Sequence, residues 1–97
     1  MNLYLLTQSV NKGYDTYDSF VVAALDEEEA KFTHPSDYVD YGWNPEKGYW
    51  EWETSRGRAN YHDSSWTSPG NVKVIYLGEA EDGLKNREVI CASFNAG

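Results

Sequence analysis

Two glutamates in the middle of the chain are spaced in a way that could support hydrolysis. Glu51 and Glu53 alternate along the stretch 48–54, where alternate residues of a strand lie on one face about 6.6 Å apart. Paired carboxylates at that separation could serve a glycosidase-like mechanism. The alternative, which we favour, is a solvated strand face with Trp50 and Trp52 packed inward, because the stretch alternates aromatic and acidic residues.

Histidines and acids raise the question of a metal site. His34, Asp37, His62 and Asp63 supply imidazole and carboxylate groups, which suit several divalent ions. However, His34 precedes Pro35 at the expected end of a helix, where a cationic imidazole would simply stabilise the helix dipole. We therefore expect no metal and no cofactor.

Motifs of the common enzyme classes are missing from the sequence. It has no glycine-rich phosphate loop, no Gly-x-Ser-x-Gly elbow and no His-Glu-x-x-His helix. A lone cysteine, Cys91, excludes an internal disulfide and a multi-thiolate zinc site. It lies in the apolar run 88–94, and we expect it to be buried as a small hydrophobic residue. The sequence favours binding over catalysis, with a minor enzyme as the least favoured alternative.

Tyrosine and tryptophan stand beside acids in two segments, residues 14–18 and 38–53. Aromatic and acidic groups together can form a hot-spot surface for a basic protein partner. The candidate partner-binding residues are Tyr14, Asp15, Tyr17, Asp18, Tyr38, Asp40, Tyr41, Trp43, Glu51 and Glu53.

The charge of the chain points in the same direction. Sixteen acidic residues oppose eight basic ones, and the net charge of −8 repels nucleic acid and membrane surfaces while attracting basic protein patches. Direct duplex binding would need a basic stripe, which the sequence lacks. Spaced carboxylates could instead mimic nucleic acid by competing with phosphates for Lys and Arg. Solubility alone would also explain the charge.

A small ligand is the alternative to a protein partner. Trp50, Trp52 and Trp66 could stack on a base, and Arg56 and Arg58 could capture a phosphate. Such a site would bind a nucleotide signal. The simpler interpretation of the two arginines is ion pairing with the acids around them.

The ends of the chain predict regular elements. Residues 2–10 and 16–24 are rich in strand formers, and Asn11-Lys12-Gly13 between them predicts a hairpin. The continuous apolar run 20–24 predicts a central strand. Two further strands are predicted at 71–77 and 88–94, on either side of a turn.

A short helix and a long irregular segment are expected between these strands. Asp26 is suited to be the N-cap of a helix over 27–33, Glu29 could complete a capping box, and Pro35 would end the helix. Residues 36–70 are rich in glycine, proline and small polar residues, which is typical of loops. Only the stretch 48–54 within them predicts a strand.

These elements predict a single α+β domain over residues 1–97. Its order is β-β-α-β-β, a mostly antiparallel four-stranded sheet with one short helix on one face and a long aromatic-rich irregular segment over an edge or the open face. The apolar stretch 3–6 is too short for a signal peptide or a membrane span, so we expect a cytoplasmic protein with no membrane contact. Both a monomer and a homodimer fit this pattern.

Three parts of the sequence carry a family resemblance. They are residues 7–24, with Gly13-Tyr14-Asp15-Thr16-Tyr17-Asp18-Ser19 at their centre, Glu29-Ala30 with His34-Pro35, and the ending 89–97. These parts resemble small uncharacterised acidic proteins encoded by bacteriophages and prophages. The resemblance assigns no catalytic or binding residue. It implies a setting in the bacterial host cell, where host-takeover and anti-defence proteins, including anti-CRISPR proteins, bind and inhibit or redirect host complexes.

Overall fold

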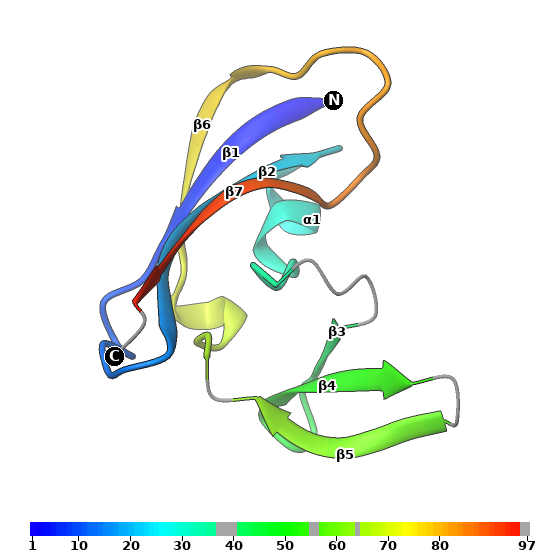
Figure 1. Ribbon diagram of the computed structural model, residues 1–97. Coiled ribbons are helices and arrows are strands. Elements are labelled where there is room, and N and C mark those ends of the chain that lie inside the picture. Colours follow the sequence, from blue (N-terminus) through cyan, green and yellow to red (C-terminus); the bar gives the residue numbers. More distant parts are fainter. Residues whose placement is uncertain (37–40, 55–56, 64, 96–97) are drawn as a thin grey trace.

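The computed structural model describes residues 1–36, 41–54, 57–63 and 65–95, and for residues 41, 52–54 and 57–63 it describes the backbone alone. This part of the chain forms two antiparallel sheets and one short helix (Figure 1). The elements are β1 (Asn2–Thr7), β2 (Thr16–Ala24), α1 (Glu27–Lys31), β3 (Tyr41–Asn44), β4 (Tyr49–Thr54), β5 (Gly57–Asp63), the 3-10 turn η1 (Pro69–Asn71), β6 (Lys73–Glu79) and β7 (Glu88–Asn95).

The first sheet confirms the predicted four-stranded antiparallel arrangement with a single short helix beside it. Its strand order is β6-β1-β2-β7, so the hairpin β1–β2 occupies the centre. Leu6 pairs with Phe20, and both side chains are buried against the helix side of the sheet. The apolar run 20–24 therefore belongs to a central strand, as predicted.

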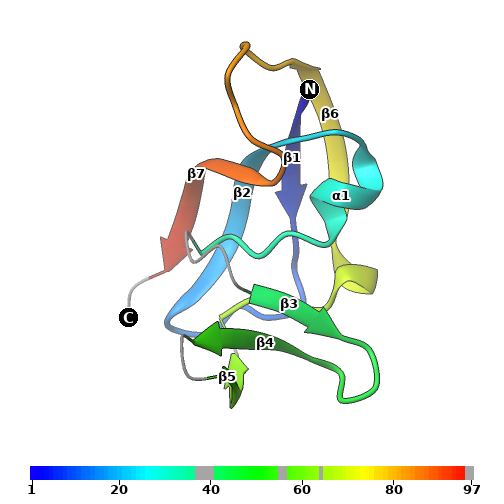
Figure 2. The same ribbon diagram turned by 90° about the vertical axis from the view of Figure 1, so that its right-hand side faces the viewer.

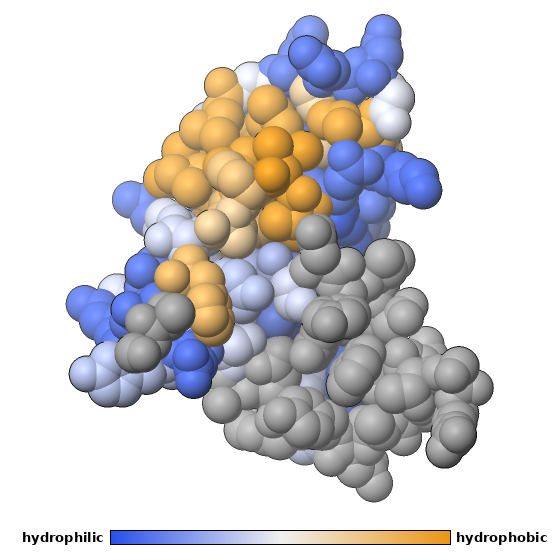
Figure 3. Space-filling model, in the orientation of Figure 1, coloured by the Kyte–Doolittle hydropathy of each residue, from blue (hydrophilic) through white to orange (hydrophobic). Residues whose placement is uncertain are grey.

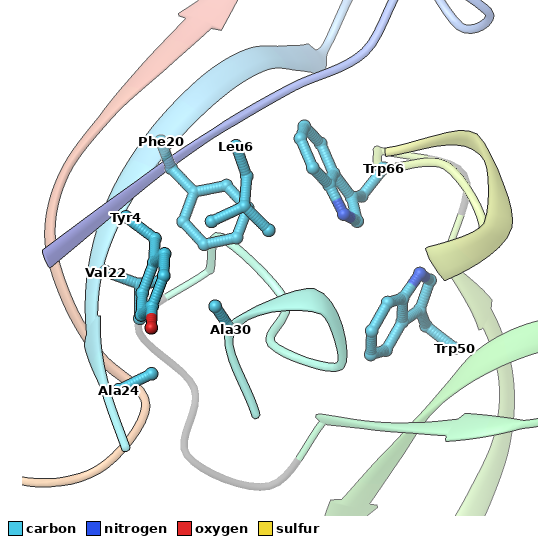
Figure 4. Packing of buried hydrophobic residues seen from close by; sticks show 8 residues of the cluster. All are labelled: Tyr4, Leu6, Phe20, Val22, Ala24, Ala30, Trp50 and Trp66. Atoms are coloured by element: carbon cyan, nitrogen blue, oxygen red, sulfur yellow. The ribbon is translucent and has the colours of Figure 1, made fainter. Parts of the chain in front are cut away.

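The core lies between this sheet and the rest of the chain (Figure 4). Alternate residues of β1 and β2 point inward, because successive side chains of a strand face opposite ways. Trp66 contacts Phe20 edge to face, with ring centroids 5.1 Å apart, and Trp50 enters the same cluster from β4. Burying a large apolar side chain contributes about 1.5–3 kcal/mol. The cluster consists of Tyr4, Leu6, Phe20, Val22, Ala24, Ala30, Trp50 and Trp66.

The opposite face of the four-stranded sheet is also apolar but remains open to solvent. The pairing register places Ile75, Leu5, Val21 and Cys91 in one row across its four strands. Figure 3 shows an apolar area over this sheet. The expectation of a buried Cys91 is wrong, because the residue is exposed. It lies on an edge strand, and no described residue covers the outer face of that strand.

Helix α1 begins as predicted and ends earlier. The Asp26 carboxylate accepts a hydrogen bond from the Glu29 backbone N–H across 2.9 Å, which is the expected N-cap. The helix ends at Lys31 rather than at residue 33. The Glu29 carboxylate accepts a hydrogen bond from Arg87 Nε across 2.6 Å, so it anchors the start of β7 instead of completing the expected capping box.

The segment 36–70 is more regular than its composition predicts. Strands β3, β4 and β5 form a second antiparallel sheet, which lies beyond α1 from the first (Figures 1 and 2). The prediction held one strand here, and β3 and β5 were missed. Asn44 and Gly48 explain the β3–β4 hairpin, because the Asn44 Oδ1 accepts from two backbone N–H groups of the turn and Gly48 has a φ of 72°.

Within the described ranges, the only α-helix has five residues. No helix there has the length and apolar character needed to cross a membrane.

Candidate functional site

The turn between β1 and β2 is held by bonds at both of its ends. At its start, the Gln8 side-chain amide donates to the carbonyl oxygens of Asn11 and Tyr17, across 2.6 and 2.9 Å. The Gln8 Oε1 accepts from the backbone N–H groups of Val10 and Asn11, across 2.9 and 2.8 Å. One side chain thus fixes a loop that would otherwise have few internal bonds.

At its end, the turn is tied to the last strand. Asn95 accepts a hydrogen bond at its carbonyl oxygen from the Asp15 N–H across 2.7 Å, and its side-chain amide donates to the Gly13 carbonyl across 3.2 Å. The Thr16 hydroxyl donates to the same Gly13 carbonyl across 2.6 Å. The turn therefore has a defined conformation against the end of β7.

Tyr14 projects from this turn. Its residue is 79% exposed, the highest value among the large hydrophobic residues of the described ranges. Asp15 next to it is exposed and has a φ of 58°, a left-handed conformation that Asp and Asn tolerate better than most residues. Asp18 is exposed as well, at a register shift in the pairing of β2 with β7. These three exposed residues, two in the turn and one near the start of β2, are called here the Tyr14 turn.

Tyr17, predicted to belong to the same surface, is instead part of the interior packing. Its ring lies 4.8 Å from that of Phe94 and 6.3 Å from that of His34. The His34 ring is 5.4 Å from that of Trp50, which is 5.4 Å from that of Trp43. This aromatic chain joins the two sheets, so half-buried Tyr17 and Trp43 stabilise the fold more than they offer a free surface.

His34 does not have the environment that its position before Pro35 predicts. The residue is 3% exposed, and its Nδ1 accepts a hydrogen bond from the Ser36 backbone N–H across 3.0 Å. The ring packs between Tyr17 and Trp50 and bonds to the loop after α1, which ends at Lys31, three residues before it. Asp37, His62 and Asp63 of the suggested metal site lie outside the residues with described side chains, and no metal-binding cluster occurs among the others.

Glu51 is buried rather than solvated. The residue is 7% exposed, and its Oε1 accepts from Asn44 Nδ2 across 2.8 Å and lies 3.7 Å from Lys47 Nζ. The pKa of Lys47 is raised by its hydrogen bond to Tyr49 first and by Glu51 to a lesser extent. The expected solvated carboxylate at this position is therefore wrong, because Glu51 is buried and binds Asn44 and Lys47 of the β3–β4 turn. Trp50 is packed inward, as predicted.

Several candidate residues cannot be placed. Tyr38 and Asp40 lie outside the described residues, and the side chains of Tyr41 and Glu53 do too. The Glu51 and Glu53 pair considered for hydrolysis thus has one described member, which is occupied by hydrogen bonds. Among the predicted partner-binding residues, only Tyr14, Asp15 and Asp18 are both described and exposed.

Two of the residues proposed for a nucleotide site are buried in the core. Trp50 and Trp66 are 1% and 3% exposed, so neither ring offers a face to a base. The side chains of Trp52, Arg56 and Arg58 lie outside the described residues. No specific observation favours a nucleotide site.

Sequence reasoning missed Gln8, the residue that organises the Tyr14 turn. The only signal was its place, as an amide side chain that ends a strand just before a loop of small polar residues. No protein family, no curated protein and no solved structure matches the chain. The functional argument therefore rests on the geometry of the Tyr14 turn and on charge.

Proposed function

We propose that this chain is a non-enzymatic phage or prophage protein that binds a host protein complex and inhibits or redirects it. The Tyr14 turn is the contact surface, and the partner presents a basic patch to it. The exposure of Tyr14 on a turn fixed at both ends is the observation that carries the proposal. The backbone of such a turn loses little conformational freedom on binding, which favours affinity.

The chemistry of the turn supports a basic partner. A tyrosine ring offers a large apolar contact and a face for an arginine or lysine, and the carboxylates of Asp15 and Asp18 add negative charge beside it. The chain as a whole carries −8, which steers a basic surface toward it. If the partner handles nucleic acid, spaced carboxylates of this kind would compete with its phosphates.

The test is affinity capture from a bacterial lysate with the tagged chain, at low and high salt, followed by mass spectrometry. We expect a salt-sensitive complex that Tyr14→Ala and the pair Asp15→Asn with Asp18→Asn both weaken. Asparagine at position 15 tolerates the left-handed backbone, so the paired substitution removes charge without adding strain.

The matched control removes the same two charges elsewhere. Glu27→Gln with Glu28→Gln alters exposed acids of α1 and leaves the Tyr14 turn intact. We expect this control to retain the partner at moderate salt. Equal loss in both pairs would show that net charge alone acts, and unchanged capture by the turn variants would refute the proposed surface. Release of the captured complex by duplex DNA would support competition for phosphate-binding residues.

A further inference from the structure

The connection between β6 and β7 is held at its two ends and not in its middle. At one end, the Ala80 N–H donates to the Met1 carbonyl oxygen across 2.9 Å. At the other end, the Arg87 N–H donates to the Ala23 carbonyl oxygen across 2.8 Å. Within the described part of the chain, residues 81–84 make no hydrogen bond and no ion pair. A change in the backbone conformation of residues 81–84 therefore breaks none of the bonds that hold the fold.

An aspartate followed by a glycine lies in this unbonded middle. Asp82 and Gly83 form a turn, and both residues are exposed. Gly83 has a φ of 93°, and the space that a Cβ would fill there is open. Asp82 is the only aspartate in the sequence that a glycine follows.

This pair of residues can react without any partner. A glycine exposes its backbone nitrogen, because no Cβ shields it. That nitrogen can attack the side-chain carbon Cγ of the preceding aspartate: the N–Cγ bond forms, the bond from Cγ to the hydroxyl breaks, and the hydroxyl leaves as water with the proton of the N–H. Water then adds to either carbonyl carbon of the resulting cyclic imide. Addition at Cγ restores the aspartate, and addition at the backbone carbonyl carbon gives isoaspartate, in which the chain continues through the former side chain.

We infer that Asp82 is a site of spontaneous isomerisation to isoaspartate in the folded protein, with water as the only co-reactant. The unbonded turn lets the Gly83 nitrogen approach Cγ of Asp82 while the sheet stays intact. Isoaspartate adds one methylene to the backbone and keeps a free carboxylate, so the net charge of −8 does not change.

Asp18 shows why the structure matters as well as the sequence. It precedes Ser19, another small residue, but Ser19 is paired with Thr7 on one side and with Ser93 on the other. These pairings hold the backbone of Asp18 and Ser19 in the middle of the sheet. Its bonds must break before the Ser19 nitrogen can approach the Asp18 carboxyl group, so the folded chain protects this position.

The site lies at the end of the sheet opposite to the Tyr14 turn (Figure 1). The connection 80–87, orange in Figure 1, runs beside the N-terminus, whereas the Tyr14 turn lies at the other end of β1. An added methylene between the two fixed points Ala80 and Arg87 leaves both of them in place. We therefore expect the isoaspartate form to keep the fold and the Tyr14 turn, and this inference does not depend on the proposed function.

The test is a long incubation of the full chain in mildly acidic buffer, where a carboxyl group is protonated part of the time. Peptides from timed samples are separated, and fragmentation mass spectrometry assigns isoaspartate to a position. We expect isoaspartate at position 82 of the native chain to accumulate within about tenfold of its rate in urea, because no hydrogen bond has to break there. At Asp18 we expect accumulation in urea and protection in the native chain. Circular dichroism checks that the native sample stays folded while it reacts.

Asp82→Glu is the matched variant. It keeps the charge, and its longer side chain closes a larger ring more slowly, so position 82 should stay unmodified in both conditions. Asp82 that stays unchanged in the native chain but isomerises in urea would overturn the inference. Equal native rates at Asp18 and Asp82, or no isoaspartate at position 82 in either condition, would overturn it as well.

Discussion

The indole N–H of Trp50 donates a hydrogen bond to the carbonyl oxygen of Thr67 across 2.8 Å, inside the core. This bond connects β4 to the segment that leads into η1, 17 residues further along the chain. Trp66, also buried and next to Thr67 in sequence, has an indole N–H with no acceptor among the described residues. The two buried tryptophans thus belong to one core, but of their two indole N–H groups only that of Trp50 has an acceptor among the described residues.

This difference predicts unequal costs for the same substitution. Trp50→Phe and Trp66→Phe both remove indole area, but Trp50→Phe also leaves the buried Thr67 carbonyl without its donor. We expect Trp50→Phe to lower the free energy of unfolding by roughly 1–3 kcal/mol more than Trp66→Phe does. Urea denaturation of both variants measures the difference. Equal losses would mean that the Trp50 bond adds nothing to stability.

The elements that the sequence predicted well depend on local chemistry. The hairpin of β1 and β2 follows from two strand-forming runs around a short polar turn, and the N-cap at Asp26 needs only residues within one helical turn. Interactions between residues close in sequence can be predicted from the sequence alone. The four strands of the first sheet were predictable because each is itself a strand-forming run, although β6 and β7 pair with strands that are distant in sequence.

The second sheet and the burial of candidate residues depend on contacts distant in sequence. Strand β5 has only a weak alternation, with Ala59 and Tyr61 between polar residues, and nothing in the residues 57–63 themselves indicates that they pair with β4. Tyr17 and Trp43 resemble surface residues because acids flank them, yet rings supplied by His34 and Trp50 cover them. The residues next to Tyr17 and Trp43 in the sequence therefore do not predict that these rings are covered. Tyr14 was predictable as a surface residue because a tight turn projects its side chain without tertiary help.

Gln8 should be critical for the order of the Tyr14 turn. Gln8→Ala removes all four of its hydrogen bonds, and since the site is partly exposed we expect a loss of about 1–3 kcal/mol in unfolding free energy. Amide hydrogen exchange at Val10 and Asn11 should accelerate, because their acceptor is gone. Gln8→Glu is the matched variant, which keeps the acceptors and loses the donors to two carbonyls. Protection of Val10 and Asn11 that survives Gln8→Ala would contradict this role.

Arg87 combines a strained backbone with an ion pair, and the two effects can be separated. Its φ is 66°, in the left-handed region, and its side chain is 44% exposed where it meets Glu29. Exposed pairs contribute about 0.2–1 kcal/mol, so screening leaves the bond weak. Arg87→Gly loses the pair and relieves the strain, whereas Arg87→Ala loses the pair and keeps the strain.

We therefore expect Arg87→Gly to be more stable than Arg87→Ala by about 1 kcal/mol in thermal or urea unfolding. Glu29→Gln removes the charge of the pair without touching the backbone, and should cost less than Arg87→Ala. If alanine and glycine at position 87 gave the same stability, the left-handed backbone would not be a cost in the folded chain.

The open face of the four-stranded sheet should make Cys91 reactive in the native protein. Its residue is exposed, so a thiol reagent needs no unfolding to reach it, and labelling should proceed within about tenfold of the rate in urea. Ala23→Cys in a Cys91→Ser background is the matched control, because Ala23 is fully buried on the neighbouring strand. Its labelling should wait for unfolding and be slower by about a thousandfold or more for a domain of ordinary stability. Labelling of native Cys91 as slow as that of the buried control would contradict its exposure on the open face.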